Sequence, residues 1–152
     1  MKKRIVWFKM LKTKKPEGRT LVKSKWVFKI KRNGTYRARL VACGYSQIPG
    51  VDYTENYYSP VINDVTFRIM LVMMKMKNWD AKIIDIVTAF LEGDLDEEIF
   101  MKIPEGYYEV FSDEDSSQEE ILELRRPIYG LVQAARMFWK KVVSILVDKL
   151  NF

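Results

Sequence analysis

The sequence predicts a single α+β domain, and three observations support this prediction. Two runs with strand-like alternation, 26–32 and 35–42, flank Asn33-Gly34, a dipeptide that accepts positive φ at both central positions of a hairpin turn. Residues 64–78 and about 134–150 repeat apolar residues at helical spacing. The 152 residues, 48% hydrophobic and 30% charged, have the size and composition of one globular domain with a real core.

The N-terminal part is expected to be an irregular basic lead-in followed by the hairpin. Residues 1–25 show no clear period, and Pro16-Glu17-Gly18 indicates a turn. In the hairpin, alternation places Trp26, Phe28 and Ile30 on one face. On the second strand, Arg37 and Arg39 fall on the face opposite Tyr36, Ala38 and Leu40. We expect one face to pack and the other to present the arginines.

The middle of the chain predicts a loop, a helix and a short strand. Gly44, Pro49-Gly50 and Pro60 indicate a loop over 43–60. Asn63 or Asp64 is expected to cap a helix that runs to about Asn78, since an apolar stripe follows at i, i+3, i+4 and i+7 (Phe67, Met70, Leu71, Met74). Its methionines are interpreted as core residues. The β-branched run 82–87 predicts a strand with Asp85 at its centre.

The C-terminal part is acidic and then helical. Between Glu92 and Glu123 there are thirteen acids and one base. Strands are expected over 98–102 and 121–124, with a mobile loop over 112–117. The last helix, about 134–150, has Phe138, Val142, Ile145 and Leu146 on one face and reaches the chain end without a cap, so we expect the sequence to stop inside a domain.

Composition excludes several kinds of chemistry. The chain has one cysteine, Cys43, and no histidine, so Cys/His zinc sites, Ser-His-Asp or Cys-His nucleophile systems and internal disulfides are excluded. Catalysis would have to use carboxylates, lysines, arginines, hydroxyls or a metal held by oxygen. No apolar run approaches the ~18 residues of a membrane span, and the N-terminus has no signal region, so a soluble intracellular protein is expected.

Charge is divided unevenly along the chain. Residues 1–49 contain fifteen Lys or Arg against the single acid Glu17, whereas the rest of the chain is acidic and the total is +6. Aromatic residues lie between these bases (Trp7, Phe8, Trp26, Phe28, Tyr36). This pattern suits a polyanion such as nucleic acid, or a solvated lysine-rich surface, and charge alone leaves both interpretations open.

Asp85 is the candidate for chemistry. A carboxylate inside an apolar strand is costly unless something pairs with it. It could be a Mg²⁺ ligand beside substrate phosphates, or a structural acid paired with a buried lysine or arginine. For an isolated residue the structural interpretation is favoured; the surrounding sequence changes that balance.

Six blocks in order resemble the copia-type reverse transcriptases of LTR retrotransposons. The blocks are Lys25-Trp26-Val27-Phe28-Lys29; Ala38-Arg39-Leu40-Val41-Ala42 with Gly44; Gly50-Val51-Asp52-Tyr53; Ser59-Pro60-Val61; Asp85-Ile86-Val87-Thr88-Ala89-Phe90-Leu91-Glu92-Gly93-Asp94-Leu95 with Glu97-Glu98-Ile99-Phe100-Met101 and Pro104-Glu105-Gly106; and Tyr129-Gly130-Leu131 with Gln133, Arg136 and Trp139. Their order over nearly the whole chain makes the resemblance highly specific.

The resemblance implies a right-hand polymerase with fingers and a partial palm. It divides the chain into a basic lead-in (1–19), fingers (about 20–80), a palm portion (about 81–125) and a fingers/palm helix region (about 126–152). Such enzymes use two Mg²⁺ ions held by three aspartates. Asp85 matches the first aspartate and would be catalytic, with the backbone carbonyl of Ile86 as a second ligand.

The resemblance also implies nucleotide-binding residues. Phe90 matches the bulky residue that blocks a ribose 2′-hydroxyl, with a plain core aromatic as the alternative. Either Arg37 or Arg39 would hold the triphosphate. Tyr129-Gly130 would lie against the incoming nucleotide and the template. The implied partners are an RNA template, a DNA primer, their RNA–DNA hybrid, dNTP and the other Pol segments (the rest of the palm, RNase H and integrase), in the cytoplasm and, for an intact element, in a virus-like particle.

The sequence departs from the family pattern at several points. Val132 replaces the usual lysine, Ala135 replaces the usual proline, and the segment 56–59 is one residue longer. The chain stops before the Tyr-x-Asp-Asp motif that supplies the other two aspartates, and no such motif occurs in it. The Mg²⁺ site is therefore not expected to be complete. Three hypotheses stay open: a polymerase fragment that is inactive alone, a non-catalytic nucleic-acid-binding module, and a remnant without function.

Overall fold

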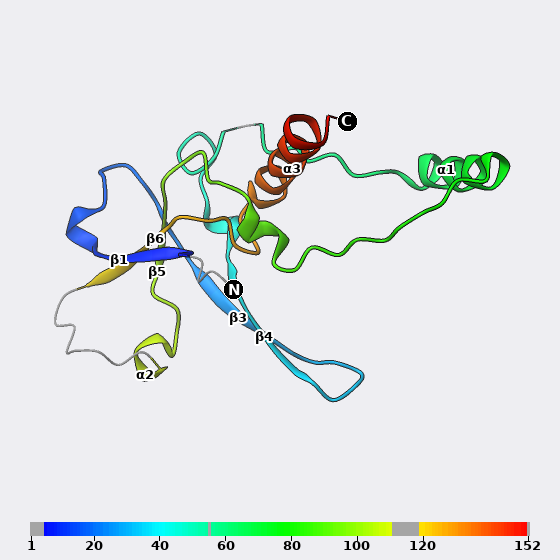
Figure 1. Cartoon of the computed structure of the whole chain (residues 1–152). Helices are drawn as coiled ribbons and strands as arrows, with labels where there is room; N and C mark the ends of the chain where they lie inside the picture. The colour runs from blue at the N-terminus through cyan, green and yellow to red at the C-terminus, as the bar shows by residue number, and fades with distance from the viewer. Residues whose placement is uncertain (1–4, 55, 111–118, 152) are drawn as a thin grey trace.

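A computed structural model describes residues 5–54, 56–110 and 119–151. Its main sheet has the order β1-β6-β5-β2, built from β1 (Trp7–Leu11), β6 (Glu120–Leu124), β5 (Ile99–Lys102) and β2 (Leu21–Val22) (Figure 1). β6 pairs antiparallel with both β1 and β5, whereas β2 pairs parallel with β5. The mixture of this sheet with helices confirms the α+β expectation at the level of fold class.

The core lies on this sheet. Three consecutive residues of β5 are buried (Ile99, Phe100, Met101), so the sheet is covered on both faces there. Leu122 and Leu124 of β6 and Val22 of β2 are buried beside them, and α3 (Ala134–Ser144) adds Ala134 and Met137. The strands expected at 98–102 and 121–124 are thus confirmed, as is the helix beginning at Ala134.

Two strands lie in the segment that was expected to be irregular. Trp7 pairs with Leu124 and packs against the core, and Leu21 pairs with Phe100. The expectation of irregular structure over 1–25 is therefore wrong for 7–11 and 21–22. These strands are specified by partners roughly a hundred positions along the chain, which a local pattern does not report.

The second sheet is the predicted hairpin, β3 (Ser24–Ile30) with β4 (Tyr36–Ala42). Its register pairs Phe28 with Ala38 and Lys29 with Arg37, as alternation predicts. The turn differs from the expectation, because only Gly34 has positive φ (+79°), and Gly34 N–H donates to Lys31 O at 2.9 Å. The apolar face is also not packed towards the tip: Phe28 is 74% exposed, and the hairpin projects from the body (Figure 1).

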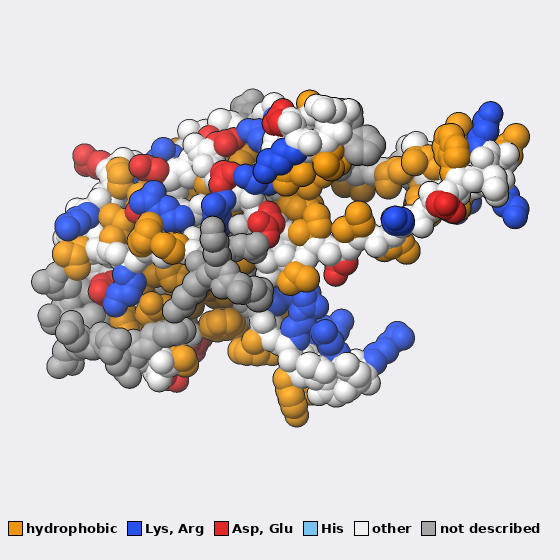
Figure 2. Space-filling view, viewed as in Figure 1, with side chains coloured by type: hydrophobic (Ala, Val, Ile, Leu, Met, Phe, Trp, Pro, Cys, Tyr) orange, Lys and Arg blue, Asp and Glu red, His pale blue; other side chains and the backbone are white. Residues whose placement is uncertain are grey.

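Helix α1 (Asp64–Lys77) matches the predicted limits. The Asn63 side chain accepts a 2.8 Å hydrogen bond from Thr66 N–H, and Asn78 ends the helix in the left-handed conformation. Its apolar residues are nevertheless not core: every residue of α1 is exposed except half-buried Met74. Figure 1 shows α1 at the end of two extended connections, away from the sheet, and Figure 2 shows hydrophobic side chains along this arm.

The strand expected over 82–87 does not form. The segment has no regular structure, and Ile83 and Ile84 are almost fully solvated. A strand requires a neighbour to accept its backbone hydrogen bonds, and none of the described strands lies beside this segment. The strand prediction for 82–87 is therefore wrong, because the β-branched residues of this segment have no described partner strand.

The remaining elements are short. 3-10 turns cover η1 (Lys12–Lys14), η2 (Gly44–Ser46) and η3 (Ala89–Glu92), and α2 covers Tyr107–Val110. The loop prediction for 43–60 is confirmed apart from η2. After α3 the last helix continues as a π-helical turn, η4 (Ile145–Lys149), in which Ile145 and Leu146 are exposed instead of packed. The loop expected over 112–117 lies outside the described residues.

Within the described part of the chain, no helix has the length and apolar character needed to cross a membrane.

Candidate active site

Three predicted nucleotide-binding residues from distant parts of the chain meet at one place. The rings of Phe90 and Tyr129 contact edge to face, with centroids 4.7 Å apart. The guanidinium carbon of Arg39 lies 5.5 Å from the centroid of the Tyr129 ring, a cation–π arrangement. Phe138 of α3 also contacts Phe90 edge to face, with centroids 6.4 Å apart. We name Arg39, Phe90, Tyr129 and Gly130 the aromatic cluster.

The Tyr129-Gly130 turn is held against the end of β4. Ala42 N–H donates to the Tyr129 carbonyl at 2.7 Å. Gly130 has φ +90°, and a Cβ at this position would lie 2.0 Å from the Ala42 carbonyl oxygen. A Cβ on Gly44 would lie 2.3 Å from the Gly130 carbonyl oxygen. Both glycines are therefore required for the two backbones to approach this closely.

Phe90 is placed by the contact between η3 and α3. Gly93, directly after η3, lies so close to α3 that a Cβ would be 2.9 Å from the Met137 carbonyl carbon. Arg126 donates to the Gly93 carbonyl at 3.0 Å and forms an ion pair with Asp94. Asp94 also pairs with Lys141 of α3 at 3.2 Å. These contacts fix η3, and with it Phe90, beside the helix.

The two candidate arginines differ in environment. Arg37 lies nearer the hairpin tip and is exposed, whereas Arg39 is half-buried. The Nε atom of Arg39 is buried and has no hydrogen-bond partner in the described structure. A buried donor without a partner is costly and calls for an acceptor. The structure thus distinguishes the two residues, which the sequence alone does not.

Asp85 and Ile86 lie apart from regular structure. Asp85 is exposed and forms no hydrogen bond or ion pair with another described residue, so the structural alternative of a buried basic partner has no support. Among the described residues, no three Cys, Asp or Glu side chains come close enough together to hold a metal ion. The donor set around Asp85 as it stands does not fit a Mg²⁺ site.

A buried polar network supports the Tyr129-Gly130 turn from behind. Gln47 accepts from Val132 N–H at 2.9 Å and donates to Gln133 Oε1 at 3.0 Å; Gln133 donates to the Asp52 carbonyl at 3.0 Å. Gln47 was missed in the sequence, where a lone glutamine in a loop gives no signal. Asp52 and Gln133 were noted only as parts of motifs.

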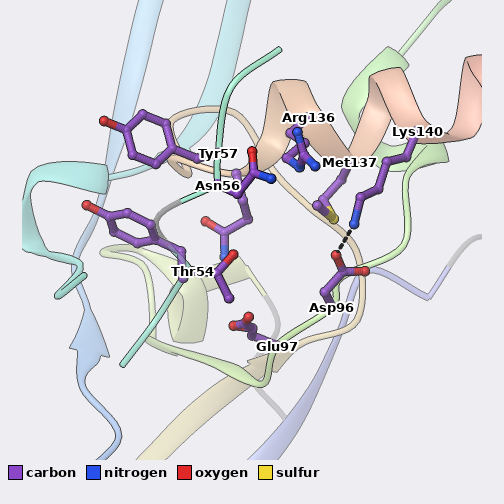
Figure 3. A pocket seen from close by; sticks show the side chains of 10 residues that line it. Thr54, Asn56, Tyr57, Asp96, Glu97, Arg136, Met137 and Lys140 are labelled. Carbon is purple, nitrogen blue, oxygen red and sulfur yellow. Dashed lines mark hydrogen bonds and ion pairs between the residues drawn. The ribbon is translucent and has the colours of Figure 1, made fainter. Parts of the chain in front are cut away.

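A cavity of about 220 Å³ adjoins this network and is lined in part by Gln133. Figure 3 shows its lining, in which the Lys140 side chain of α3 points to Asp96, and Arg136, Glu97, Thr54, Asn56 and Tyr57 line the rest of the cavity. Lys140 forms an ion pair with Asp96, and Arg136 donates to the Tyr58 carbonyl at 3.0 Å. Its cations are therefore already engaged.

One pair of titration shifts lies at the edge of the main sheet. The hydrogen bond from Lys9 lowers the pKa of Glu120, and the same hydrogen bond raises the pKa of Lys9. The two groups are 3.1 Å apart, and Tyr108 also donates to Glu120 at 3.0 Å. This pairing joins β1 to β6.

Comparisons with known proteins agree on one family. A family model described as reverse transcriptase (RNA-dependent DNA polymerase) matches residues 8–152. The Retrovirus-related Pol polyprotein from transposon TNT 1-94 of Nicotiana tabacum is 36% identical over 136 residues, covering 86% of this chain and 10% of the polyprotein. That from transposon RE2 of Arabidopsis thaliana is 38% identical over 137 residues, covering 87% and 9%. A more distant relative is the Transposon Ty1-NL2 Gag-Pol polyprotein of Saccharomyces cerevisiae, at 24% identity over 138 residues, covering 91% and 7%.

No solved structure matches the chain. The chain spans about a tenth of the length of the curated relatives it matches. The match to the family model over almost all residues, together with plant relatives well above 30% identity, confirms the resemblance found in the sequence. This chain belongs to the reverse transcriptase (RNA-dependent DNA polymerase) family and is a reverse transcriptase segment of the kind found in the Pol polyproteins of copia-type retrotransposons.

Proposed function

We propose that the aromatic cluster is the incoming-nucleotide site of an RNA-directed DNA polymerase, and that this chain contributes its fingers and part of its palm. The observation that carries the proposal is the buried Nε of Arg39, which has no partner in the described structure and lies in the same side chain that contacts Tyr129. A guanidinium held by an aromatic face with a free donor is suited to a phosphate oxygen. Arg39, not Arg37, is therefore assigned to the triphosphate.

Each other member of the cluster has a role by its chemistry. The Phe90 ring contacts Tyr129 edge to face, and we assign Phe90 to the exclusion of a 2′-hydroxyl on the sugar of the incoming nucleotide. Tyr129 and Gly130 lie where a base or the template could rest on an aromatic and a side-chain-free backbone. The RNA template, DNA primer, their RNA–DNA hybrid and dNTP are the proposed ligands, and the other Pol segments the proposed partners.

Asp85 and the Ile86 carbonyl are proposed as the part of a Mg²⁺ site that this chain carries. The described residues do not complete that site, so no catalytic step is assigned to the chain alone. The full chain is expected to show no DNA synthesis on a primed RNA template with Mg²⁺. Incorporation above a no-protein control would show that the assignment of the active site is wrong.

The test of nucleotide binding compares two arginines of the same strand. Titration calorimetry with dATP on the full chain is expected to show that Arg39→Met weakens binding by about tenfold or more, because one charge-assisted hydrogen bond and a cation–π contact are lost. Arg37→Met, the matched control, should change affinity by less than about threefold. Equal losses, or a wild-type chain that does not bind dATP, would overturn the proposal.

A second candidate function is nucleic-acid binding without chemistry. The hairpin presents Lys29, Lys31, Arg32 and Arg37 to solvent, and Figure 2 shows Lys and Arg side chains gathered over it. Lys29 and Arg37 are paired across the hairpin, so they share one face. Such a surface is suited to contacts with the phosphates of a nucleic acid.

Salt dependence tests this second function. If both residues neutralise phosphates, Lys29→Gln with Arg37→Gln should reduce the slope of log affinity against log salt by about 1.4 to 1.8 for a primed or single-stranded oligonucleotide. Lys75→Gln with Lys77→Gln on the exposed helix α1 removes the same charge elsewhere and should leave the slope unchanged. If both double variants showed the same slope of log affinity against log salt, binding would depend on net charge alone and not on the hairpin surface.

A further inference from the structure

The polar network behind the Tyr129-Gly130 turn runs in one direction. It begins at a backbone donor, Val132 N–H, and ends at a backbone acceptor, the Asp52 carbonyl. Between them, the amides of Gln47 and Gln133 each accept on one side and donate on the other. Because both ends are fixed backbone groups, neither amide can be flipped without placing two donors or two acceptors against each other.

At these two buried positions, only side-chain amides of this length can both accept and donate the hydrogen bonds of the network. Gln47 and Gln133 are each 6% exposed, so water does not readily replace a missing partner. A carboxylate accepts but does not donate, and an apolar side chain does neither. Fewer side-chain types can therefore replace Gln47 and Gln133 than can replace a residue in an ordinary loop.

The far end of the network is anchored on a rigid loop. Asp52 is 1% exposed, and its carboxylate accepts from Ile48 N–H at 2.8 Å and from the Thr20 hydroxyl. Gly50 N–H donates to the Tyr53 carbonyl at 2.8 Å within the same loop. The near end, Val132, is two residues after Gly130. The network thus connects a fixed loop to the segment that carries Tyr129.

We propose that Gln47 and Gln133 are positioning residues that hold the Tyr129-Gly130 turn in place, and so set the Tyr129 ring against Phe90 and Arg39. The turn has contacts from Ala42 at the end of β4 and from Gly44 at the start of η2, and the network supplies a further support through Val132. The expected effect on nucleotide affinity rests on the proposed function. The placement of the Tyr129 ring does not, and it can be measured separately.

Gln47→Met removes the acceptor of Val132 N–H while keeping side-chain length. Hydrogen exchange at the Val132 amide should then become faster, and the nuclear Overhauser effect between the Phe90 and Tyr129 rings, 4.7 Å apart at their centroids, should weaken. Exchange at Leu122 in β6 should stay as in wild type, because the main sheet is not involved. Affinity for dATP should fall by about tenfold, as expected for a displaced binding group.

Gln133→Glu makes the same network sensitive to pH. As a carboxylate, the new group would place an acceptor against the Asp52 carbonyl; when protonated, its hydroxyl donates there as the amide does. Burial and nearby acids raise the pKa of the introduced carboxyl, so stability is present at low pH and lost as pH rises through that pKa. The charged and titratable groups around the site are Asp52, Tyr53, Tyr57, Asp96, Glu97, Arg136 and Lys140.

The comparison is made as the ratio of the variant to wild type at each pH, on the full chain. At about pH 8 the variant should show fast Val132 exchange, a weakened ring contact and a melting temperature lower by about 3 to 10 °C; at about pH 4 all three should return to wild-type values. Asn33→Asp is the control, because the exposed Asn33 side chain only accepts a hydrogen bond, from Thr35 N–H, and a carboxylate can accept the same hydrogen bond. It should show no such pH dependence.

The outcomes separate the two proposals. Unchanged Val132 exchange and ring contact in Gln47→Met, or a lower melting temperature in Gln133→Glu without a change at the turn, would overturn the positioning role. Failure of Gln133→Glu to recover at low pH would do the same, even if Gln47→Met does not fold. If the ring contact responds as expected but wild type does not bind dATP, the relay is upheld and the nucleotide-binding proposal is refuted.

Discussion

Gly130 combines two features that a side chain does not tolerate. Its φ is +90°, and a Cβ would lie 2.0 Å from the carbonyl oxygen of Ala42 and 2.6 Å from Cγ1 of Val41. The substitution Gly130→Ala must therefore strain the backbone and push the turn away from β4. The hydrogen bond from Ala42 N–H to the Tyr129 carbonyl, 2.7 Å long, cannot survive such a displacement.

The expected cost follows from these parts. A positive φ on a residue with a Cβ costs about 1 to 2 kcal/mol, and loss of one buried backbone hydrogen bond costs about 0.5 to 1.5 kcal/mol. Gly130→Ala should thus lower the free energy of unfolding by about 1.5 to 3.5 kcal/mol. Gly34→Ala is the matched control, because Gly34 has φ +79° with nothing within 4 Å of a Cβ. It should cost at most about 1 to 2 kcal/mol, from the backbone alone.

Urea unfolding followed by tryptophan fluorescence measures both variants, since Trp7 packs against the core. Gly44→Ala completes the comparison: it has no positive φ, but its Cβ would lie 2.3 Å from the Gly130 carbonyl oxygen. Gly130→Ala is expected to destabilise the protein most, and Gly44→Ala and Gly34→Ala less. Equal losses for Gly130→Ala and Gly34→Ala would refute the close approach of the turn to β4.

Three further predictions follow from described environments. Asp85→Asn should change the free energy of unfolding by less than about 0.5 kcal/mol, because the carboxylate is exposed and unpaired with described residues; a loss near 3 kcal/mol would reveal a buried basic partner. Because the pKa of Glu120 is lowered in the folded state, its contribution to the free energy of unfolding is present above about pH 4 and lost as pH falls through the folded pKa. Glu120→Gln should therefore reduce the loss of unfolding free energy between neutral and acid pH by about 0.2 to 1 kcal/mol, measured by urea unfolding at each pH. Phe67→Gln on exposed α1 should cost less than about 0.5 kcal/mol, whereas Leu122→Ala in the core should cost about 2 to 5 kcal/mol by the same denaturation assay.

Local signals predicted the elements that local chemistry determines. The cap at Asn63, the left-handed end at Asn78 and the register of the hairpin all depend on residues within a few positions of each other. The positive φ at Gly34 was expected, but the same conformation at Asn33 was not adopted, because a longer turn with a single left-handed residue closes the hairpin.

Packing could not be predicted in the same way. An apolar stripe shows which face of α1 would be buried, but not whether another element covers it, and here none of its residues is buried. The run 82–87 has strand-forming residues without a described strand beside it. Of the candidate site, the resemblance identified Phe90, Tyr129 and both arginines, but Gln47 and the free donor of Arg39 depend on contacts between segments far apart in sequence.

The pairing of β1 with β6 has a consequence for folding during synthesis. Lys12 and Glu119, at the end of this ladder, are 107 positions apart. At about 5 to 20 residues per second, a ribosome needs about 5 to 20 seconds to deliver the partner of β1 after β1 itself has emerged. During that interval the hairpin β3–β4 and helix α1 have only local contacts, which are marginally stabilising in water, and β1, including Trp7, has no strand to pair with. The N-terminal strand therefore lacks its partner strand until Leu124 is made, and the main sheet cannot close before then.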